Sequence, residues 1–295
     1  MKRKYDISRR QLVSGYLFLL PNIIGFITLT FIPVVASLLL SFTDWDAFGV
    51  PNFIGLKNYS DMFMDETFRI SFKNNIYFTV GSVPATIVLG LALAVLMNNK
   101  SKYIGIFRTI YFTPYITATI AVSVVWLAIY HPTMGPVNGF LRSIGIVNPP
   151  QWTASSTWAM PSIILMSIWK SCGYCMVLFM AGLQGISREY YEASEIDGAT
   201  RWEQFVNITL PMLSPTIFFV TVMGIINSFM VFDQIYIMTE GGPGRATNVL
   251  VYHIYKESFQ NYNFGYASAM AYFLFVLIMV VTLLQFRGQK EWVHY

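Results

Sequence analysis

Long apolar stretches are the feature that most restricts what this chain can fold into. A helix needs about 20 mostly apolar residues to cross the hydrocarbon core of a bilayer, and six stretches meet that length. Lipid offers backbone N–H and C=O groups no hydrogen-bond partner, so each stretch must satisfy these groups internally, as a helix does. The sequence therefore predicts an all-α polytopic membrane protein with six transmembrane helices in a single domain, residues 1–295. The predicted spans are residues 14–41, 76–97, 105–130, 159–183, 212–235 and 266–286.

Composition agrees with a membrane protein. Hydrophobic residues make up 55% of the chain and charged residues 12%, whereas soluble domains carry about 25% charged residues. The net charge of +4 is small and the basic residues are dispersed, which disfavours nucleic-acid binding. Pro21, Pro33 and Pro84 lie inside apolar runs and predict kinks, which membrane helices tolerate.

The distribution of Lys and Arg predicts the orientation. The chain begins with the basic segment MKRKYDISRR, but the apolar run that follows is too long for a signal peptide and has no A-x-A cleavage site, so it predicts an uncleaved first span. With the N-terminus in the cytoplasm, twelve of the 19 Lys and Arg residues fall in cytoplasmic segments and six in outer loops. This bias favours both termini inside. The outer loops are then residues 42–75, 131–158 and 236–265.

An acidic link, residues 184–211, separates the fourth and fifth predicted spans. Ser187 is a candidate N-cap with Glu189 in the first turn of a short helix. Gly198 suits a left-handed helix end, and Thr200 with Glu203 three residues later is a capping box that starts a second helix. The link is thus predicted to form a helix, a sharp turn and a helix at the cytoplasmic surface. It either packs on its own bundle or docks a soluble partner through exposed carboxylates and aromatic side chains.

The second helix of the link has a predicted apolar face. Trp202, Phe205, Val206 and Thr209 follow the i, i+3, i+4, i+7 spacing. Pro211 marks the turn into the fifth span.

The same link resembles the EAA loop of permease subunits in binding-protein-dependent ABC importers. The segment EASEIDGATRWEQFVNITLP matches that signature with unbroken spacing, and Ser194 stands where the signature has a second alanine. Serine is small enough that close packing is expected to survive. The matching positions are Glu192, Ala193, Ser194, Asp197, Gly198, Ala199, Phe205, Ile208, Leu210 and Pro211.

Other segments extend the resemblance along nearly the whole chain. They are LLPNIIGFITLTFIPVVASLLLSFTDWD, FIGLKNY, FRTIYFTPYI, IWKSCGYCMVLFMAGLQGI and MTEGGPGRATNVLVYHIYKESFQNYNFGYASAMAY. The first loop and the TEGGP segment narrow the similarity to the carbohydrate-uptake group, like the first permease of maltose- or glycerol-phosphate-type systems.

The resemblance implies a mechanism and partners. Two homologous permeases would form the pathway in the bacterial plasma membrane, two ATPase subunits would dock on the EAA loops, and an external binding protein would deliver a carbohydrate. Glu192 would contact the ATPase, Gly198 would allow the turn, and Asp197 would hold the elbow. The coupling residues implied by the match are Glu192, Ala193, Ser194, Asp197, Gly198 and Ala199.

The chain itself is expected to be a transport subunit and not an enzyme. It contains no GxxxxGK[ST] phosphate loop, so no cofactor is expected here, and ATP with magnesium would bind the partner ATPase.

Polar and aromatic residues within the spans are candidates for the substrate pathway, because sugars bind to aromatic faces and neutral hydrogen-bonding groups. The alternative for Asn227 and Ser228 is hydrogen bonding between helices. For Lys170 it is a salt bridge to a partner subunit or snorkelling to the membrane surface, and Asp233 near the outer mouth has a structural alternative. The predicted pathway residues are Asn227, Ser228, Phe229, Asp233, Trp169, Lys170 and Tyr174, and the fifth span also offers Phe232, Gln234 and Tyr236.

In the outer loop after the fifth span, Gly241, Gly242 and Pro243 either contact the binding protein or form a plain turn. Cys172 and Cys175, in the segment CGYC, are predicted to be small packing residues one turn apart, since a redox dithiol motif normally occurs in a soluble βαβ setting. No histidine or cysteine cluster predicts a metal site.

Two other function classes fit the sequence less well. An ion-coupled secondary transporter should show paired ionisable residues at mid-membrane, but only Lys170 lies clearly within a span, with Asp233 near an end. An intramembrane enzyme would need a cluster of nucleophile, base or metal ligands within the spans, and the sequence offers none.

Overall fold

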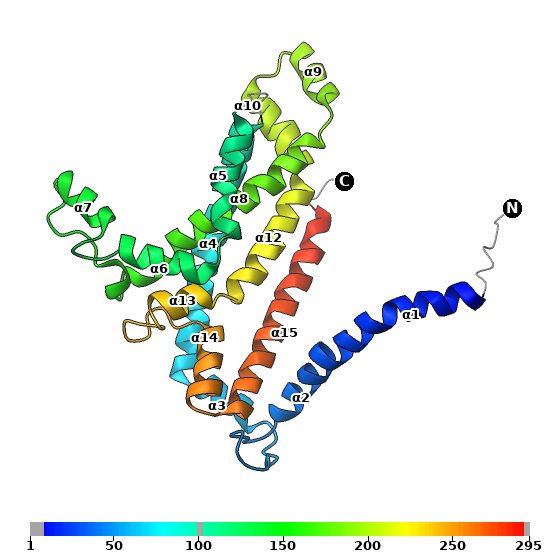
Figure 1. Ribbon diagram of the computed structural model, residues 1–295. Coiled ribbons are helices and arrows are strands. Elements are labelled where there is room, and N and C mark those ends of the chain that lie inside the picture. The colour runs from blue at the N-terminus through cyan, green and yellow to red at the C-terminus, as the bar shows by residue number, and fades with distance from the viewer. Residues whose placement is uncertain (1–8, 99–102, 292–295) are drawn as a thin grey trace. The chain divides into compact units, whose positions relative to one another are not determined.

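The computed structural model describes residues 9–98 and 103–291. Within these ranges the regular structure is helical, apart from an isolated β-bridge between Thr43 and Phe53 (Figure 1). The predicted all-α class is therefore confirmed.

Four helical segments are long and apolar enough to cross a membrane singly, and two bent helix pairs bring the number of candidate spans in the described residues to six. The first segment comprises α1 (Arg9–Phe26), η1 (Ile27–Phe31) and α2 (Ile32–Leu40). The other single spans are α4 (Glu66–Met97), α8 (Ala159–Gln184) and α15 (Phe264–Gly288). The bent pairs are α5 (Ile104–Ile116) with α6 (Thr119–Ile129), and Arg201–Met212 with α12 (Ser214–Phe229).

The shorter elements lie between the spans. They are α3 (Lys57–Met64), α7 (Pro136–Ser143), η2 (Trp152–Ala154), α9 (Arg188–Ile196), α10 (Arg201–Gln204), η3 (Phe205–Thr209), α11 (Leu210–Met212), α13 (Asp233–Met238), α14 (Leu250–Tyr255), η4 (Lys256–Gln260) and η5 (Gln289–Glu291).

The prolines of the predicted spans stand at different places relative to the helix breaks. Pro33 stands at the start of α2, directly after the π-helix η1, but α4 continues through Pro84. The largest bend, 99° between α5 and α6, follows Pro114, which has no N–H to donate to the preceding turn and so weakens the end of α5. Thr117 and Ala118 then adopt extended backbone angles, with ψ of 139° and 128°.

The chain divides into two compact units. The first comprises the residues up to Met62 together with Glu257–Tyr272. Its links include the Asn58 side chain, which donates to the carbonyls of Ser41 and Thr43 at 2.9 and 2.8 Å. The first span in this unit leaves its apolar side chains exposed, so its surface is available to lipid or to another protein.

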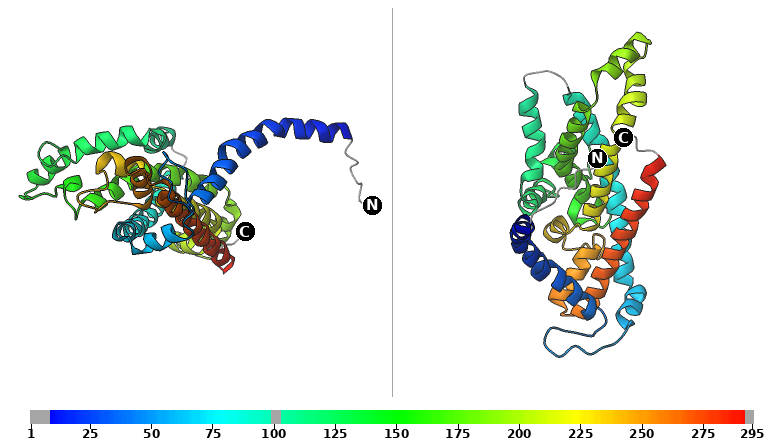
Figure 2. Two further views of the ribbon diagram at one scale, coloured as in Figure 1. Left: turned by 90° about the horizontal axis from the view of Figure 1, so that it is seen from below. Right: turned by 90° about the vertical axis from the view of Figure 1, so that its right-hand side faces the viewer.

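The second unit comprises Phe63–Lys256 and the residues from Phe273 onward. Within it, α4 packs along α8 and α12, α5 packs along α8, and α13 packs on α6 (Figures 1 and 2). Small side chains allow membrane helices to approach closely, and hydroxyl groups can bond across them. The buried side of α4 carries such residues at Ser71, Asn75, Thr79, Ser82, Thr86, Gly90 and Ala94.

Two glycines mark the closest helix contacts of this unit. A Cβ atom at Gly90 would meet Cys175 and the α8 backbone, and one at Gly173 would overlap the Tyr111 carbonyl oxygen of α5. Both cysteines of the CGYC segment are buried and free, and the Cys172 thiol donates to the Trp169 carbonyl at 3.3 Å. The packing interpretation of this segment is confirmed.

Replacing Gly173 by alanine should destabilise the second unit, because the new methyl group would push the α5 backbone away from α8. Overpacking of this kind costs about 1–3 kcal/mol. Gly105→Ala is the matched control, since nothing lies within 4 Å of a Cβ atom there and a helical alanine is favoured by about 0.5–1 kcal/mol. Thermal unfolding in detergent should show a lower midpoint for Gly173→Ala and an equal or higher one for Gly105→Ala. Equal midpoints for both variants would contradict the close contact.

Candidate functional site

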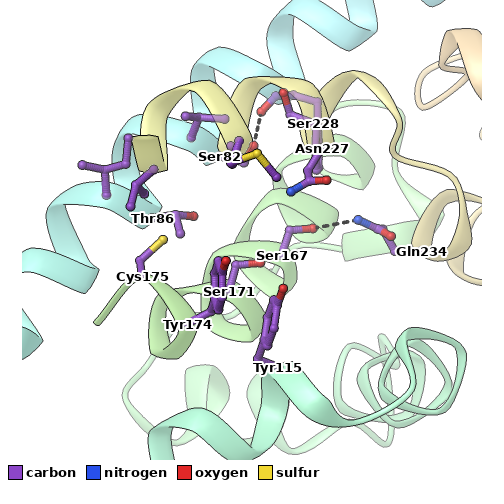
Figure 3. Close-up of a pocket in the computed structure, with 16 residues that line it drawn as sticks. Ser82, Thr86, Tyr115, Ser167, Ser171, Tyr174, Cys175, Asn227, Ser228 and Gln234 are labelled. Carbon is purple, nitrogen blue, oxygen red and sulfur yellow. Dashed lines mark hydrogen bonds between the residues drawn. The ribbon is translucent and has the colours of Figure 1, made fainter. Parts of the chain in front are cut away.

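A cavity of about 170 Å³ lies within the second unit, among α4, α8, α12 and the facing ends of α5 and α13 (Figure 3). The residues that line it are Phe78, Ser82, Val83, Thr86, Ile87, Tyr115, Ser167, Ser171, Tyr174, Cys175, Val220, Met223, Gly224, Asn227, Ser228 and Gln234.

One side of the cavity carries neutral hydrogen-bonding groups. Asn227 near the end of α12, Gln234 in α13 and Ser167 in α8 point toward the same space (Figure 3). The Gln234 amide donates to the Ser167 hydroxyl at 3.3 Å, which links the start of α13 to α8. The amide and hydroxyl groups can both donate and accept hydrogen bonds.

The opposite side is aromatic. The rings of Tyr115 and Tyr174 stack with centroids 4.4 Å apart and an interplanar angle of 11°. Both residues line the cavity beside Ser171 (Figure 3). The described lining residues carry no Asp, Glu, Lys or Arg. Aromatic side chains on one side and neutral polar groups on the other suit an uncharged, hydroxyl-rich ligand group.

Three of the predicted pathway residues line this cavity, namely Asn227, Ser228 and Tyr174. Of these three, Ser228 already forms hydrogen bonds within the protein. The Ser228 hydroxyl pairs with that of Thr79 on α4 at 2.8 Å and donates to the Ile225 carbonyl. Ser228 therefore also bridges two helices, as the alternative interpretation expected.

The other four predicted pathway residues lie outside the lining. Phe229 is buried, Asp233 is exposed at the start of α13, and Trp169 packs edge-on against Trp126, with ring centroids 5.4 Å apart. The Lys170 ammonium donates to the Tyr115 carbonyl at 3.0 Å.

Sequence analysis did not select several lining residues. Tyr115 comes from the third span, and Ser82 and Thr86 come from the second. The signal for the α4 residues was available, because small polar residues recur along one side of that helix. Tyr115 had no comparable signal, since its position depends on the bend between α5 and α6.

The acidic link forms the predicted helix, turn and helix. The Ser187 side chain accepts from Glu189 N–H and caps α9, and Thr200 with Glu203 forms the complete capping box. The Thr200 N–H donates to the Glu203 carboxylate at 2.7 Å. Gly198 has φ of 82°, the left-handed conformation that glycine adopts readily. These local predictions are confirmed.

Side-chain bonds join the two helices of this hairpin. The Ser194 hydroxyl donates to the Tyr191 carbonyl at 2.8 Å and accepts from the Gln204 amide at 3.0 Å. The Tyr191 hydroxyl pairs with that of Thr209 at 2.9 Å. Thr209 lies at the end of the π-helix η3, one element before the fifth span resumes.

The predicted apolar face of the second helix is only partly formed. The π-helix at Phe205–Thr209 changes the angular spacing that the face assumed. Trp202 is 71% exposed, whereas Thr209 is buried. Ile196, at the end of α9, is 86% exposed, and the carboxylates of Glu192 and Asp197 are exposed on the same short segment. The tip of the hairpin thus presents apolar side chains among negative charges.

The segment Gly241–Pro243 forms a tight turn. Gly241 has φ of 77° and a Cβ atom there would meet the Tyr252 ring, while the Gly242 N–H donates to the Thr239 carbonyl at 2.8 Å and the Gly242 carbonyl accepts from Thr247 Oγ at 2.7 Å. Gly242 and Pro243 also border a shallow surface pocket with Thr153 and Glu240.

Over the residues that the structure describes, no group of three or more His, Cys, Asp or Glu side chains is arranged to hold a metal ion.

Comparison with known proteins agrees with the helical architecture. The chain is 39% identical to the probable ABC transporter permease protein YesP of Bacillus subtilis (strain 168), over 100% of this chain and 96% of the relative. It is 34% identical to the lactose transport system permease protein LacF of Rhizobium radiobacter, over 99% and 97%. The crystal structure of a bacterial alginate ABC transporter in complex with an alginate pentasaccharide-bound periplasmic protein contains a chain that matches with a TM-score of 0.83 and 26% identity, over 96% of both chains.

The model of the binding-protein-dependent transport system inner membrane component family matches residues 86–289. This range includes four of the six candidate spans and part of a fifth, together with the whole hairpin and every residue of the cavity except Phe78, Ser82 and Val83. The chain therefore belongs to this family, as a multi-pass membrane permease subunit of an ABC transporter and not as an enzyme.

Proposed function

We propose that this chain is one of two permeases in an ATP-driven importer that carries a sugar or oligosaccharide delivered by an external binding protein. The observation that carries the proposal is the cavity, which is lined by the stacked pair Tyr115 and Tyr174 on one side and by the neutral amides of Asn227 and Gln234 on the other. Aromatic faces bind the C–H surfaces of sugars, and amides bind hydroxyl groups. Relatives named for lactose, sn-glycerol-3-phosphate and trehalose/maltose transport support a carbohydrate or a related solute.

The exposed first span supports a second permease as partner. Its apolar side chains are unburied in this chain, so a homologous subunit would cover part of them in the assembled transporter. The name of the family and the alginate complex with its periplasmic protein support a binding protein at the outer face. Gly242 and Pro243 are the proposed contact, because their tight turn presents a fixed surface beside a shallow pocket.

The hairpin is the proposed docking site for the ATPase subunits, on the cytoplasmic side of the plasma membrane with both chain termini. Its exposed Ile196 and Trp202 would enter an apolar cleft, and Glu192 and Asp197 would face basic side chains of the ATPase. The coupling set is Glu192, Ala193, Ser194, Asp197, Gly198 and Ala199, with ATP and magnesium held by the ATPase.

Movement of the hairpin would reach the cavity through a continuous chain of bonded elements. The Tyr191–Thr209 hydrogen bond joins α9 to the end of η3. From there α11 and α12 lead to Asn227 and Ser228. ATP binding would favour one orientation of the hairpin and so shift the permease between inward- and outward-facing states.

The proposal is tested by reconstitution. The tagged chain, captured from native membranes with its bound subunits, should carry a second permease and an ATPase. In proteoliposomes supplied with the external binding protein, radiolabelled lactose, maltose, trehalose, an alginate oligosaccharide and sn-glycerol 3-phosphate would be offered in turn. Uptake of at least one of them should require ATP. Uptake driven by an ion gradient without ATP would instead support an ion-coupled transporter.

Replacing Gly198 by valine should uncouple ATP hydrolysis from transport, because a β-branched residue is strongly disfavoured at positive φ and the elbow would change its angle. Gly145→Val is the matched control, since Gly145 also has positive φ and open space around its Cα but lies in a predicted outer loop. Stimulation of the ATPase by loaded binding protein should be lost in Gly198→Val and kept in Gly145→Val. Normal stimulation in both variants would rule out a role of the Gly198 elbow in coupling.

Replacing Asn227 should mainly change KM for uptake, whereas replacing Ser228 should mainly change the stability of the protein. Asn227→Leu keeps a similar size but removes the amide from the cavity, and loss of one neutral hydrogen bond of about 0.5–1.5 kcal/mol should raise KM for uptake about 2- to 12-fold. Ser228→Ala should mainly lower the thermal unfolding midpoint, because it removes the bridge to Thr79. A normal KM for Asn227→Leu with every transported solute would assign that residue to packing alone.

A further inference from the structure

The break between α5 and α6 leaves backbone carbonyls without helical partners. In the last turn of α5, the Thr113 carbonyl accepts from the N–H and the hydroxyl of Thr117. Thr117 and Ala118, which follow the last residue of α5, have extended backbone angles. The helix therefore supplies no N–H donor to the Tyr115 carbonyl. An unsatisfied carbonyl within a membrane span costs several kcal/mol.

Lys170 on α8 supplies that donor. Its ammonium group donates to the Tyr115 carbonyl at 3.0 Å and lies 5.6 Å from the centroid of the Tyr115 ring. A positive charge also interacts favourably with the negative end of a helix dipole, here the end of α5. One lysine thus binds both the backbone and the aromatic ring of the same residue.

Tyr115 is held from a second direction by α8. Its ring stacks on Tyr174, which lies four residues after Lys170 and so on the same side of that helix. Between these two residues in the sequence, Gly173 allows the α5 backbone at Tyr111 to pack closely against α8. The stacked pair forms the aromatic side of the cavity, but Lys170 is not among the residues that line it.

We propose that Lys170 is a positioning residue that fixes the end of α5 and thereby holds Tyr115 in the ligand-binding position. The proposal rests on the function proposed above and specifies which residue positions the aromatic side of the cavity. Lys170 acts through Tyr115 and does not contact the transported solute.

The test is a double-mutant cycle between Lys170 and Tyr115 in the assembled transporter. Lys170→Met keeps the length of the side chain without its charge, and Tyr115→Leu removes the aromatic face. The first readout is KM for uptake of whichever offered solute the wild type carries fastest. Lys170→Met should raise KM about tenfold, since a charged hydrogen bond and a cation–π contact are lost. In the Tyr115→Leu background the same change should raise KM by less than about twofold.

Lys170→Arg should return KM to within about threefold of the wild-type value, because arginine can also donate to a carbonyl and stack on an aromatic ring. A direct contact with an anionic solute predicts a different pattern. Lys170→Met would then impair uptake of only the anionic members of the panel. It would do so equally in the wild-type background and in the Tyr115→Leu background, and that result would overturn the positioning role.

A second readout needs no solute. The thermal unfolding midpoints of the wild type, the two single variants and the double variant form the same cycle. We expect Lys170→Met to lower the midpoint in both the wild-type and the Tyr115→Leu backgrounds, because Tyr115→Leu keeps the backbone carbonyl to which Lys170 donates. If no solute of the panel is transported, the function proposed above fails while this cycle still decides the positioning role. An unchanged midpoint for Lys170→Met in both backgrounds, or equal KM increases in both backgrounds, would overturn the proposal.

Discussion

The structure depends on one constraint, which is that every backbone polar group within the bilayer must find a partner in the protein. Continuous helices such as α4 and α8 meet it internally, whereas interrupted spans need side chains. At the interruption after Ile116, the side chains of Thr117 and Lys170 donate hydrogen bonds to backbone carbonyls at the end of α5. The space around it, together with the end of α12 and the start of α13, becomes the cavity. Helix breaks thus border the cavity, and the groups that satisfy the backbone at one break also position one side of the cavity.

Close helix packing is the second requirement for the same cavity. Within lipid there is no hydrophobic driving force that brings apolar side chains together. Membrane helices therefore associate through closely packed surfaces and hydrogen bonds. Gly173 lets the α5 backbone approach α8 closely enough for Tyr115 and Tyr174 to stack. On α4, Thr79 bonds to Ser228 and fixes the end of α12. Small residues therefore determine where the larger polar and aromatic residues stand.

Sequence reasoning found the elements that depend on local rules. Span lengths follow from apolar composition, and the hairpin follows from the Ser187 cap, Gly198 and the Thr200–Glu203 box, all of which act within a few residues. The bend after α5 was not predicted, because a proline within an apolar run weakens one turn without fixing the angle between the two parts of the span. The role of Lys170 was not found either, since its partner is a backbone carbonyl 55 residues away and carries no side-chain signal.

Ser194 shows how a small departure from a signature acquires a structural consequence. From its size alone, serine is expected only to pack as alanine does. In the structure its hydroxyl both donates to Tyr191 and accepts from Gln204, so α9 and α10 are bonded across the Gly198 turn. Alanine could make neither bond. Because Tyr191 also bonds to Thr209, the hairpin is fixed to the base of the fifth span at two levels. In the proposed coupling, these bonds would make α9 and α10 move together, whereas an elbow hinged at glycine alone would absorb part of that motion.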